Sequence, residues 1–194
     1  MNLWSDAGAL SQPVACDLIR AEAARAMRML WALRSLRPDV TITRAEARLD
    51  DVLHRTLQAV ESERRLRRID VSVLVQSPRE VRLLADSGQL VGALSALVSA
   101  AWSLFEMEPG SRLLLRAIVR RDHHVTIEAC REAFTVDRDL LTGAFEHPWP
   151  VGSGPSALAL LQAARNVAMR HGGHASASTG LAGTSVAVML PILN

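Results

Sequence analysis

The chain ends in the segment that decides its fold: His171-Gly172-Gly173-His174, then Gly180-Leu181-Ala182-Gly183-Thr184, then Leu190-Pro191. A helix is predicted over residues 154–170, and the paired glycines end it because glycine readily adopts the left-handed conformation of a helix C-terminus. Strands are predicted at 174–179 and 184–190, and the glycines between them suit a tight reversal of the chain. The segment therefore predicts a helix followed by a hairpin.

Upstream of this segment, the pattern mixes strands and helices. Strands are predicted at residues 40–43, 69–75 and 81–85, and a hairpin at 113–121 and 125–130. Helices are predicted over residues 44–65, from Asp86 or Ser87 through Ala101, and near 138–145. This order indicates an α+β fold, in which helices cover one face of a sheet as a two-layer α/β sandwich.

A further helix precedes the sandwich. Ser11 can cap it, Pro13 fits its first turn, and Pro38 ends it. Its apolar residues recur at alternating spacings of three and four, as in the a/d seam of a coiled coil: Cys16, Ile19, Ala23, Ala26, Leu30 and Leu33. We expect residues 1–39 to form a dimerisation helix, with a helix at 44–66 as its candidate partner in a helical hairpin, and residues 40–194 to form the main domain.

Composition argues against several classes of function. The net charge of +2 is too small to indicate a nucleic-acid or membrane partner, and aromatic residues make up only 4% of the chain. We find no signal peptide and no run of about 18 uncharged apolar residues, and we therefore expect a cytoplasmic protein without a membrane span. Cys16 and Cys130 lack the spacing of a metal site and are expected to be reduced.

The order of elements, together with the terminal segment, resembles the ATP-binding catalytic domain of sensor histidine kinases, in the superfamily of the gyrase and MutL ATPases. In that family a long helix ends in His-Gly-Gly, a Gly-x-Gly-Thr turn joins two strands, and the last strand ends in Leu-Pro. The resemblance covers residues from about 40 to 191. Asp86 and Leu90 match the start of the helix that carries the family's asparagine box. The resemblance implies a sandwich of the histidine-kinase type.

The same resemblance implies that the positions for magnesium and adenine are degenerate. The asparagine that coordinates magnesium in the family falls at Ala100, with an earlier asparagine position at Ala96. Alanine offers no oxygen ligand to a magnesium ion. The aspartate that accepts a hydrogen bond from adenine falls at Arg131, and a guanidinium group can only donate.

The glycine-rich boxes survive only in part. The family's lid glycines fall at Leu158 and Leu160, although Gly152-Ser153-Gly154 is present just upstream. Glycines at these positions let backbone amides approach a phosphate, and leucine side chains would fill that space. The retained residues are Gly180, Gly183 and Thr184, which a tight strand reversal would also require. We therefore expect no bound cofactor, no metal and no ATPase or autokinase activity.

Within this superfamily the chain resembles bacterial histidine phosphotransferases, which pair a dimeric helical bundle with a degenerate ATP-binding-like domain. The resemblance implies an adaptor or phosphotransferase of two-component signalling. Such a protein would form a homodimer and would dock a response-regulator receiver domain or a sensor kinase. Two alternatives stay open, namely a divergent ATP-binding histidine kinase with an altered pocket and a regulatory binding module of the anti-sigma type.

Phosphotransfer by such a protein needs an exposed histidine, and the first helix contains none. The first histidine of the chain is His54, which the helical periodicity places away from the apolar face of helix 44–65, and it is our candidate phosphoacceptor. It is followed by Arg55 rather than by the family's usual acidic residue. Trp31 lies off the seam of the first helix, where it can pack on helix 44–65 or the main domain, or anchor a partner.

Overall fold

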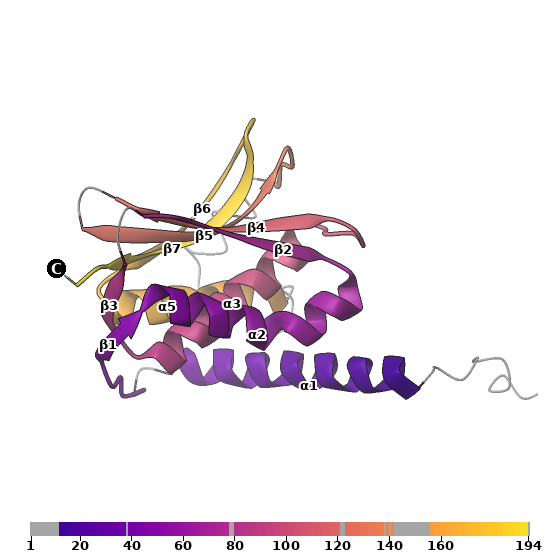
Figure 1. Cartoon of the computed structure of the whole chain (residues 1–194), viewed down its shortest axis with the longest axis horizontal. Coiled ribbons are helices and arrows are strands. Elements are labelled where there is room, and N and C mark those ends of the chain that lie inside the picture. The colour runs from indigo at the N-terminus through magenta and orange to yellow at the C-terminus, as the bar shows by residue number, and fades with distance from the viewer. Residues whose placement is uncertain are drawn as a thin grey trace, which may run out of the picture.

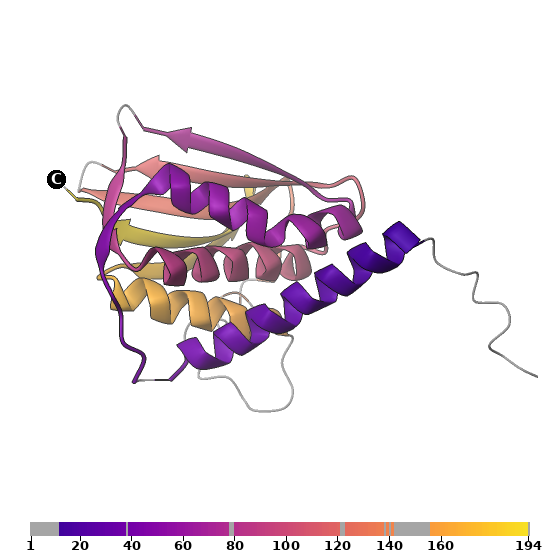
Figure 2. The same cartoon turned by 60° about the horizontal axis from the view of Figure 1, so that its bottom comes forward.

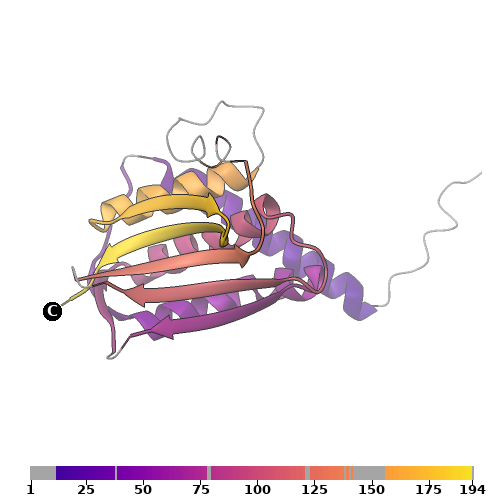
Figure 3. The same ribbon diagram turned by 90° about the horizontal axis from the view of Figure 1, so that it is seen from above.

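The computed structural model describes residues 12–37, 39–77, 80–120, 123–137, 139, 141 and 156–193. One face of a five-stranded sheet is covered by helices, and α1 (Gln12–Ser35) lies across the outer side of those helices (Figure 1). Among the described residues, no helix lies on the opposite face of the sheet (Figure 3). The α+β class and the histidine-kinase type of sandwich predicted from the sequence are confirmed.

The sheet has the strand order β2-β4-β5-β7-β6. Its strands are β2 (Asp70–Gln76), β4 (Arg112–Val119), β5 (His124–Glu132), β6 (His174–Gly180) and β7 (Gly183–Pro191). Only β2 and β4 run parallel, and the other neighbours are antiparallel. Alternate residues of the central strands, among them Leu115, Ile127 and Val188, are buried, as expected for a sheet with one covered face.

The central helix of the covering layer is α3 (Ser87–Leu104), which packs between α2 (Leu49–Arg67) and α5 (Ser156–Arg170). It begins where the sequence predicted, because the Asp86 carboxylate accepts a hydrogen bond of 3.0 Å from the Gln89 amide. Its 18 residues carry no charge, although polar serine and glutamine residues interrupt the apolar ones. The helix is apolar enough to cross a membrane, but here 67% of it is buried inside the fold.

The segment before α2 differs from the prediction. Residues 40–43 are not a strand, and the strand is β1 (Ala45–Arg48), which pairs with β3 (Arg82–Ala85). Helix α2 therefore begins at Leu49 rather than at residue 44. The cause is a long-range contact, because pairing with β3 holds these residues extended and the Leu49 amide donates to the Val81 carbonyl at 2.9 Å. The helix predicted near 138–145 and the Pro38 stop lie largely outside the described residues.

A buried polar cluster attaches α1 to the helical layer. The Arg28 guanidinium pairs with the Glu63 carboxylate of α2, and the two side chains are only 9% and 7% exposed. Glu63 also accepts hydrogen bonds from Arg67 at 2.9 Å and from Ser99 of α3 at 3.3 Å. Burial lowers the pKa of Arg28, and the nearby Glu63 opposes that shift. The charged end of α2 is thus not wholly a solvated surface.

We predict that Glu63→Gln strongly destabilises the protein, because it leaves the Arg28 charge buried without a counter-ion. The expected loss in the free energy of unfolding is about 3–5 kcal/mol, measured by urea denaturation. The matched control is Glu61→Gln, two residues earlier on the same helix, where the carboxylate is 32% exposed. Loss of that surface pair should cost less than about 1 kcal/mol. Equal effects of the two substitutions would contradict this account.

Candidate functional site

The region where the sequence placed a degenerate nucleotide site lies along α3 and α5, which pack against each other. Ala96 and Ala100 are both fully buried, with no exposed surface. Neither position can supply an oxygen ligand, and neither faces an open space. Helix packing occupies the place where a magnesium ligand would have to reach a nucleotide.

Arg131, at the expected adenine position, is engaged within the protein. Its Nη1 donates to the carbonyl of Phe105 and, at 3.3 Å, to that of Glu106, both at the C-terminal end of α3. Its guanidinium carbon lies 4.2 Å from the centre of the Phe134 ring. A cation at this end of a helix is favourable, because the free carbonyls there carry partial negative charge. Arg131 therefore stabilises the end of α3 in this structure.

Leu158 and Leu160, at the expected lid positions, both lie inside α5. Leu160 is buried, and Leu158 is half-buried against the core. These side chains are part of the packing of the helix against the core. Gly152 and Gly154 lie outside the described residues.

The retained glycines differ in what the structure requires of them. Gly183 has a φ of +129°, and a Cβ there would lie 2.3 Å from the Arg131 carbonyl oxygen. Gly173 is equally restricted, since its Cβ would lie 1.9 Å from the Met189 carbonyl oxygen. A Cβ on Gly180 would meet no atom within 4 Å. The close approaches at Gly173 and Gly183 account for two of these glycines without any nucleotide.

Thr184 has a structural role at the start of β7. It is 1% exposed, and its hydroxyl donates to the Phe134 carbonyl at 2.7 Å and accepts from the Val136 amide at 3.2 Å. These bonds hold the segment that follows β5 against the end of β7. Phe134, which stacks on Arg131, is thereby fixed as well.

His171 joins the end of α5 to the start of α3. Its Nδ1 donates to the Val167 carbonyl at 2.7 Å, and its Nε2 accepts from the Asp86 amide at 3.0 Å. Both bonds require the neutral imidazole, because Nε2 must keep its lone pair. Burial lowers the pKa of His171, an effect that the hydrogen bond to Val167 only partly opposes. The residue is a buried connector, although the sequence suggested only the end of a helix.

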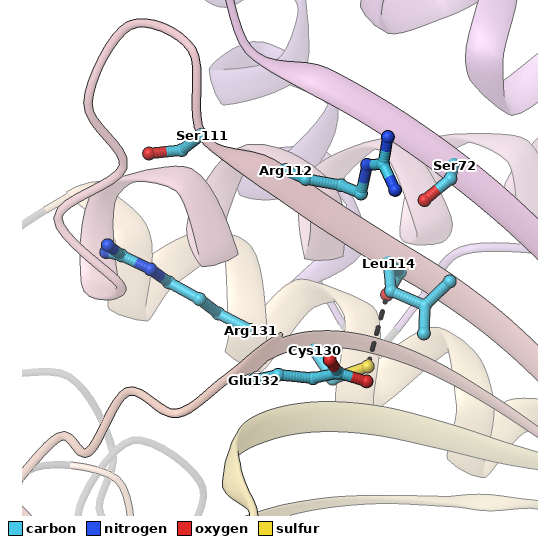
Figure 4. A pocket seen from close by; sticks show the side chains of 7 residues that line it. All are labelled: Ser72, Ser111, Arg112, Leu114, Cys130, Arg131 and Glu132. Carbon is cyan, nitrogen blue, oxygen red and sulfur yellow. Dashed lines mark hydrogen bonds between the residues drawn. The ribbon is translucent and has the colours of Figure 1, made fainter.

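The polar hollow shown in Figure 4 lies on the open face of the sheet, and Arg131 is the one expected nucleotide position among the residues that line it. Its volume is about 410 Å³, and it is lined by Ser72, Ser111, Arg112, Leu114, Cys130, Arg131 and Glu132. Cys130 donates to the Leu114 carbonyl at 3.4 Å, and burial raises the pKa of its thiol. The Arg131 side chain extends away from Cys130 and Glu132 (Figure 4). Among the described residues, no group of three or more His, Cys, Asp or Glu side chains could hold a metal ion.

His54 lies on α2 with an exposed side chain, and its Nε2 is 2.9 Å from Gln58 Nε2. It lies on a different helix from Ala96 and Ala100 of α3 and from Leu158 and Leu160 of α5. Trp31 packs on the main domain, since a Cβ on Gly92 of α3 would lie 2.4 Å from its indole ring. The sequence had left this contact open.

The predicted seam of α1 lies on the side of the helix that faces solvent. All six of its residues are exposed: Cys16, Ile19, Ala23, Ala26, Leu30 and Leu33. The exposed fractions are 68% for Ile19, 61% for Leu30 and 55% for Leu33. The opposite side of the helix packs on α2, α3 and α5. The sequence missed the Arg28–Glu63 pair that fixes this orientation, although Thr56, Val60 and Glu63 share one helical face.

No protein-family model matches the sequence, and no curated protein matches it. Solved structures do match. The catalytic domain of the histidine kinase ThkA aligns with a TM-score of 0.64 and 16% identity, over 77% of this chain and 95% of that one. The mycobacterial sensor histidine kinase MprB aligns with a TM-score of 0.59 and 21% identity, over 77% of this chain and 98% of that one. ThkA in its complex with the response regulator TrrA aligns with a TM-score of 0.67 and 17% identity, over 97% of this chain and 53% of that one. At these identities the likeness shows the fold.

We predict that the protein loses stability on mild acidification through His171. The unfolded pKa of a histidine is about 6.5, and the folded pKa of His171 lies below it. At pH values between these two pKa values, the folded state therefore binds fewer protons than the unfolded state. Stability from this residue is complete above about pH 6.5 and falls as the pH falls towards the folded pKa.

In the wild type, the free energy of unfolding, measured at several pH values by chemical denaturation, should decrease as the pH falls below about 6.5. The slope should shrink in His171→Gln. The control His174→Gln changes an exposed histidine three residues away and should keep the slope. An unchanged slope in His171→Gln would show that other groups cause the acid sensitivity.

Proposed function

The chain has the fold of a histidine-kinase catalytic domain, and from this premise we propose that it is a two-component signalling adaptor of the histidine-phosphotransferase kind. It works in the cytoplasm without hydrolysing ATP. It forms a homodimer through α1 and docks response-regulator receiver domains. The proposal has three parts, namely a closed nucleotide region, a helix that offers an apolar surface, and a receiver partner.

The observation that carries the proposal is the packing of α3 on α5. Ala96 and Ala100 have no exposed surface, and Leu160 is buried in α5. A magnesium nucleotide needs oxygen ligands for the metal and backbone amides near the phosphates. Ala96 and Ala100 offer no oxygen ligand, and Arg131 is held by carbonyls where adenine would need an acceptor. Loss of nucleotide chemistry leaves recognition as the use of the domain.

The exposed seam of α1 supports dimerisation. Soluble proteins rarely leave a contiguous apolar stripe on one helix face, and an a/d pattern is the form in which helices pair. The buried Arg28–Glu63 pair holds α1 in the orientation that exposes the stripe. The apolar stripe of α1 is therefore already oriented for contact with a second chain.

The receiver partner is proposed by analogy with ThkA, which has been solved in complex with the response regulator TrrA. That structure aligns with 97% of this chain, so the comparison includes α1 as well as the sandwich. His54 is the proposed phosphoacceptor because it is exposed on α2. In the relay step its imidazole nitrogen would attack the aspartyl phosphate of the receiver. The P–O bond breaks, an N–P bond forms, and the aspartate carboxylate leaves.

We predict that the protein does not bind magnesium-ATP. A ligand at one hundred times its dissociation constant stabilises a protein by about 2.7 kcal/mol, which corresponds to a shift of roughly 5–10 °C in Tm for a chain of this size. A thermal-shift titration with millimolar magnesium-ATP should show no resolvable shift. An active histidine-kinase catalytic domain serves as the positive control. A saturable shift with micromolar affinity would overturn the adaptor function in favour of a divergent ATP-binding kinase.

We predict that a phosphorylated receiver domain binds the chain and transfers its label to His54. Radiolabelled phosphate should appear on the wild type and on the control His174→Ala, and should be absent from His54→Ala. Binding of the receiver is measured in parallel by calorimetry, because binding without label would assign an adaptor role and exclude the relay. A panel of receivers that gives neither binding nor label would contradict the proposed function.

A further inference from the structure

Strand β2 forms one edge of the large sheet and, among the described strands, pairs only with β4. Figure 2 shows it as the outermost strand of that sheet, and α1 lies on the other side of the helical layer. Three consecutive apolar residues of β2 are exposed, namely Val73 by 37%, Leu74 by 42% and Val75 by 39%. Successive side chains of a strand point to opposite faces of the sheet. Apolar surface is therefore exposed on both faces of this edge.

The side of β2 that faces away from β4 presents free backbone groups. The amide and carbonyl of successive residues in a strand point to alternate sides, and the Asp70 amide donates to the Ser111 carbonyl, next to β4, at 2.9 Å. The residues that point away from β4 are therefore Val71, Val73 and Val75. In the described part of the chain, no strand lies beside their amide and carbonyl groups.

Proteins commonly protect such an edge with lysine, proline, a bulge or an inward-pointing charge. Strand β2 has none of these devices, because residues 70–76 contain no lysine or proline and pair with β4 in an uninterrupted register. Its one charged residue, Asp70, lies at the start of the strand and is paired with Arg64 at 3.7 Å and Arg112 at 3.4 Å. The edge therefore has the properties of a surface that accepts a further strand.

We propose that this edge pairs with β2 of a second copy of the chain, antiparallel and about a two-fold axis through Val73. In that register Val73 lies opposite its own copy, and Val71 lies opposite Val75. Each such pair exchanges two hydrogen bonds, so every outward-pointing amide and carbonyl of the three valines gains a partner. The two sheets become one continuous sheet. The inference goes beyond the proposed function, because it uses a surface separate from the apolar stripe of α1.

The side chains of β2 are complementary to their own copies in this register. The three valines lie on the helical face, beside the buried residues of β4, and they would adjoin one another across the axis. Pairs of β-branched residues across strands stabilise a sheet. On the open face Ser72 would adjoin Leu74, and Asp70 would adjoin Gln76, whose amide can donate to the carboxylate. No two like charges of β2 are opposed, so the edge is suited to a copy of itself.

A symmetric parallel pair of β2 strands cannot form the same ladder. In parallel pairing, a residue that points towards its partner strand lies opposite one that points away, as Asp70 and Arg112 do here. A two-fold axis along the strands would instead place identical residues opposite each other. Amide would then face amide and carbonyl would face carbonyl. Symmetry and hydrogen bonding together leave the antiparallel arrangement.

The pairing is expected to be reversible. A strand of seven residues offers a small contact, and small interfaces are typical of transient association. Where α1 pairs as well, the two separate interfaces would join homodimers into larger assemblies.

The register is tested by cross-linking the full chain in a background of Leu30→Glu, Cys16→Ser and Cys130→Ala, which charges the α1 stripe and removes the native thiols. Diamide should convert Val73→Cys to a disulfide dimer and take up the two electrons and two protons that the thiols lose. Opposed Cα atoms of a hydrogen-bonded pair lie about 5.5 Å apart, within the range of a disulfide. The matched control is Gln76→Cys on the same strand, whose copies would lie about 20 Å apart. It should cross-link about tenfold more slowly or less.

A mixture of two variants reports the register directly. In the same background, chains with Val71→Cys and chains with Val75→Cys should form mixed dimers in preference to dimers of either kind alone. Equal yields of all three dimers would overturn the proposal. The same holds if Val73→Cys cross-links no faster than Gln76→Cys, and the edge would then be left to an extended segment of another protein.

A proline at the edge tests the hydrogen bonds themselves. Val73→Pro removes one outward amide and leaves the bonds to β4 in place, because Val73 points away from β4. Sedimentation of the Leu30→Glu chain at rising concentration should show a dimer, whose association constant falls about tenfold with Val73→Pro. Val73→Lys is a second edge variant, and circular dichroism checks that both fold.

Two sedimentation results would reject the proposal: a monomer at every concentration, or self-association that survives both edge variants. Calorimetry separates this failure from failure of the proposed function. Binding of the receiver should be the same with and without Val73→Pro, because β2 takes no part in it. Loss of the edge pairing alone therefore leaves the signalling function standing.

Discussion

The buried ion pair between Arg28 and Glu63 is the contact on which the arrangement of the molecule depends. It joins α1 to α2, and Ser99 brings α3 into the same cluster. A buried pair costs desolvation, and additional hydrogen bonds such as that from Arg67 to Glu63 offset part of this cost, while Arg28 Nε stays buried without a partner. Because this cluster sets the rotation of α1 about its own axis, it also decides that the apolar stripe points to solvent.

The second constraint is the close packing of α3 on α5. Alanines at 96 and 100 let the helices approach, and the leucines of α5 fill the remaining space. A polar side chain at Ala100 would have to be buried without a partner, which is unfavourable. These alanines and leucines therefore complete a hydrophobic core. Arg131 stabilises the C-terminal end of α3 by donating a hydrogen bond to the Phe105 carbonyl.

Much of the fold was predictable from the sequence because its signals are local. The cap at Asp86, the glycines after α5 and the hairpin of β6 and β7 act within a few residues, and they were predicted to within one or two positions. The strand at Ala45–Arg48 was misplaced because only its pairing with β3 makes it extended. The burial of Glu63 could not be predicted, since nothing near it in sequence reveals that Arg28 comes to lie beside it.

The sequence by itself determined the α+β sandwich, the a/d spacing of α1 and the kinds of side chain at Ala100 and Arg131, because side-chain type and period set these. The tertiary structure alone decided what those features do. In the tertiary structure the seam of α1 faces solvent, and Ala96 and Ala100 are fully buried. His171 is also buried, and it links α5 to α3 through its hydrogen bond with the Asp86 amide. Each of these results depends on contacts between residues far apart in the chain, whose partners no local pattern specifies.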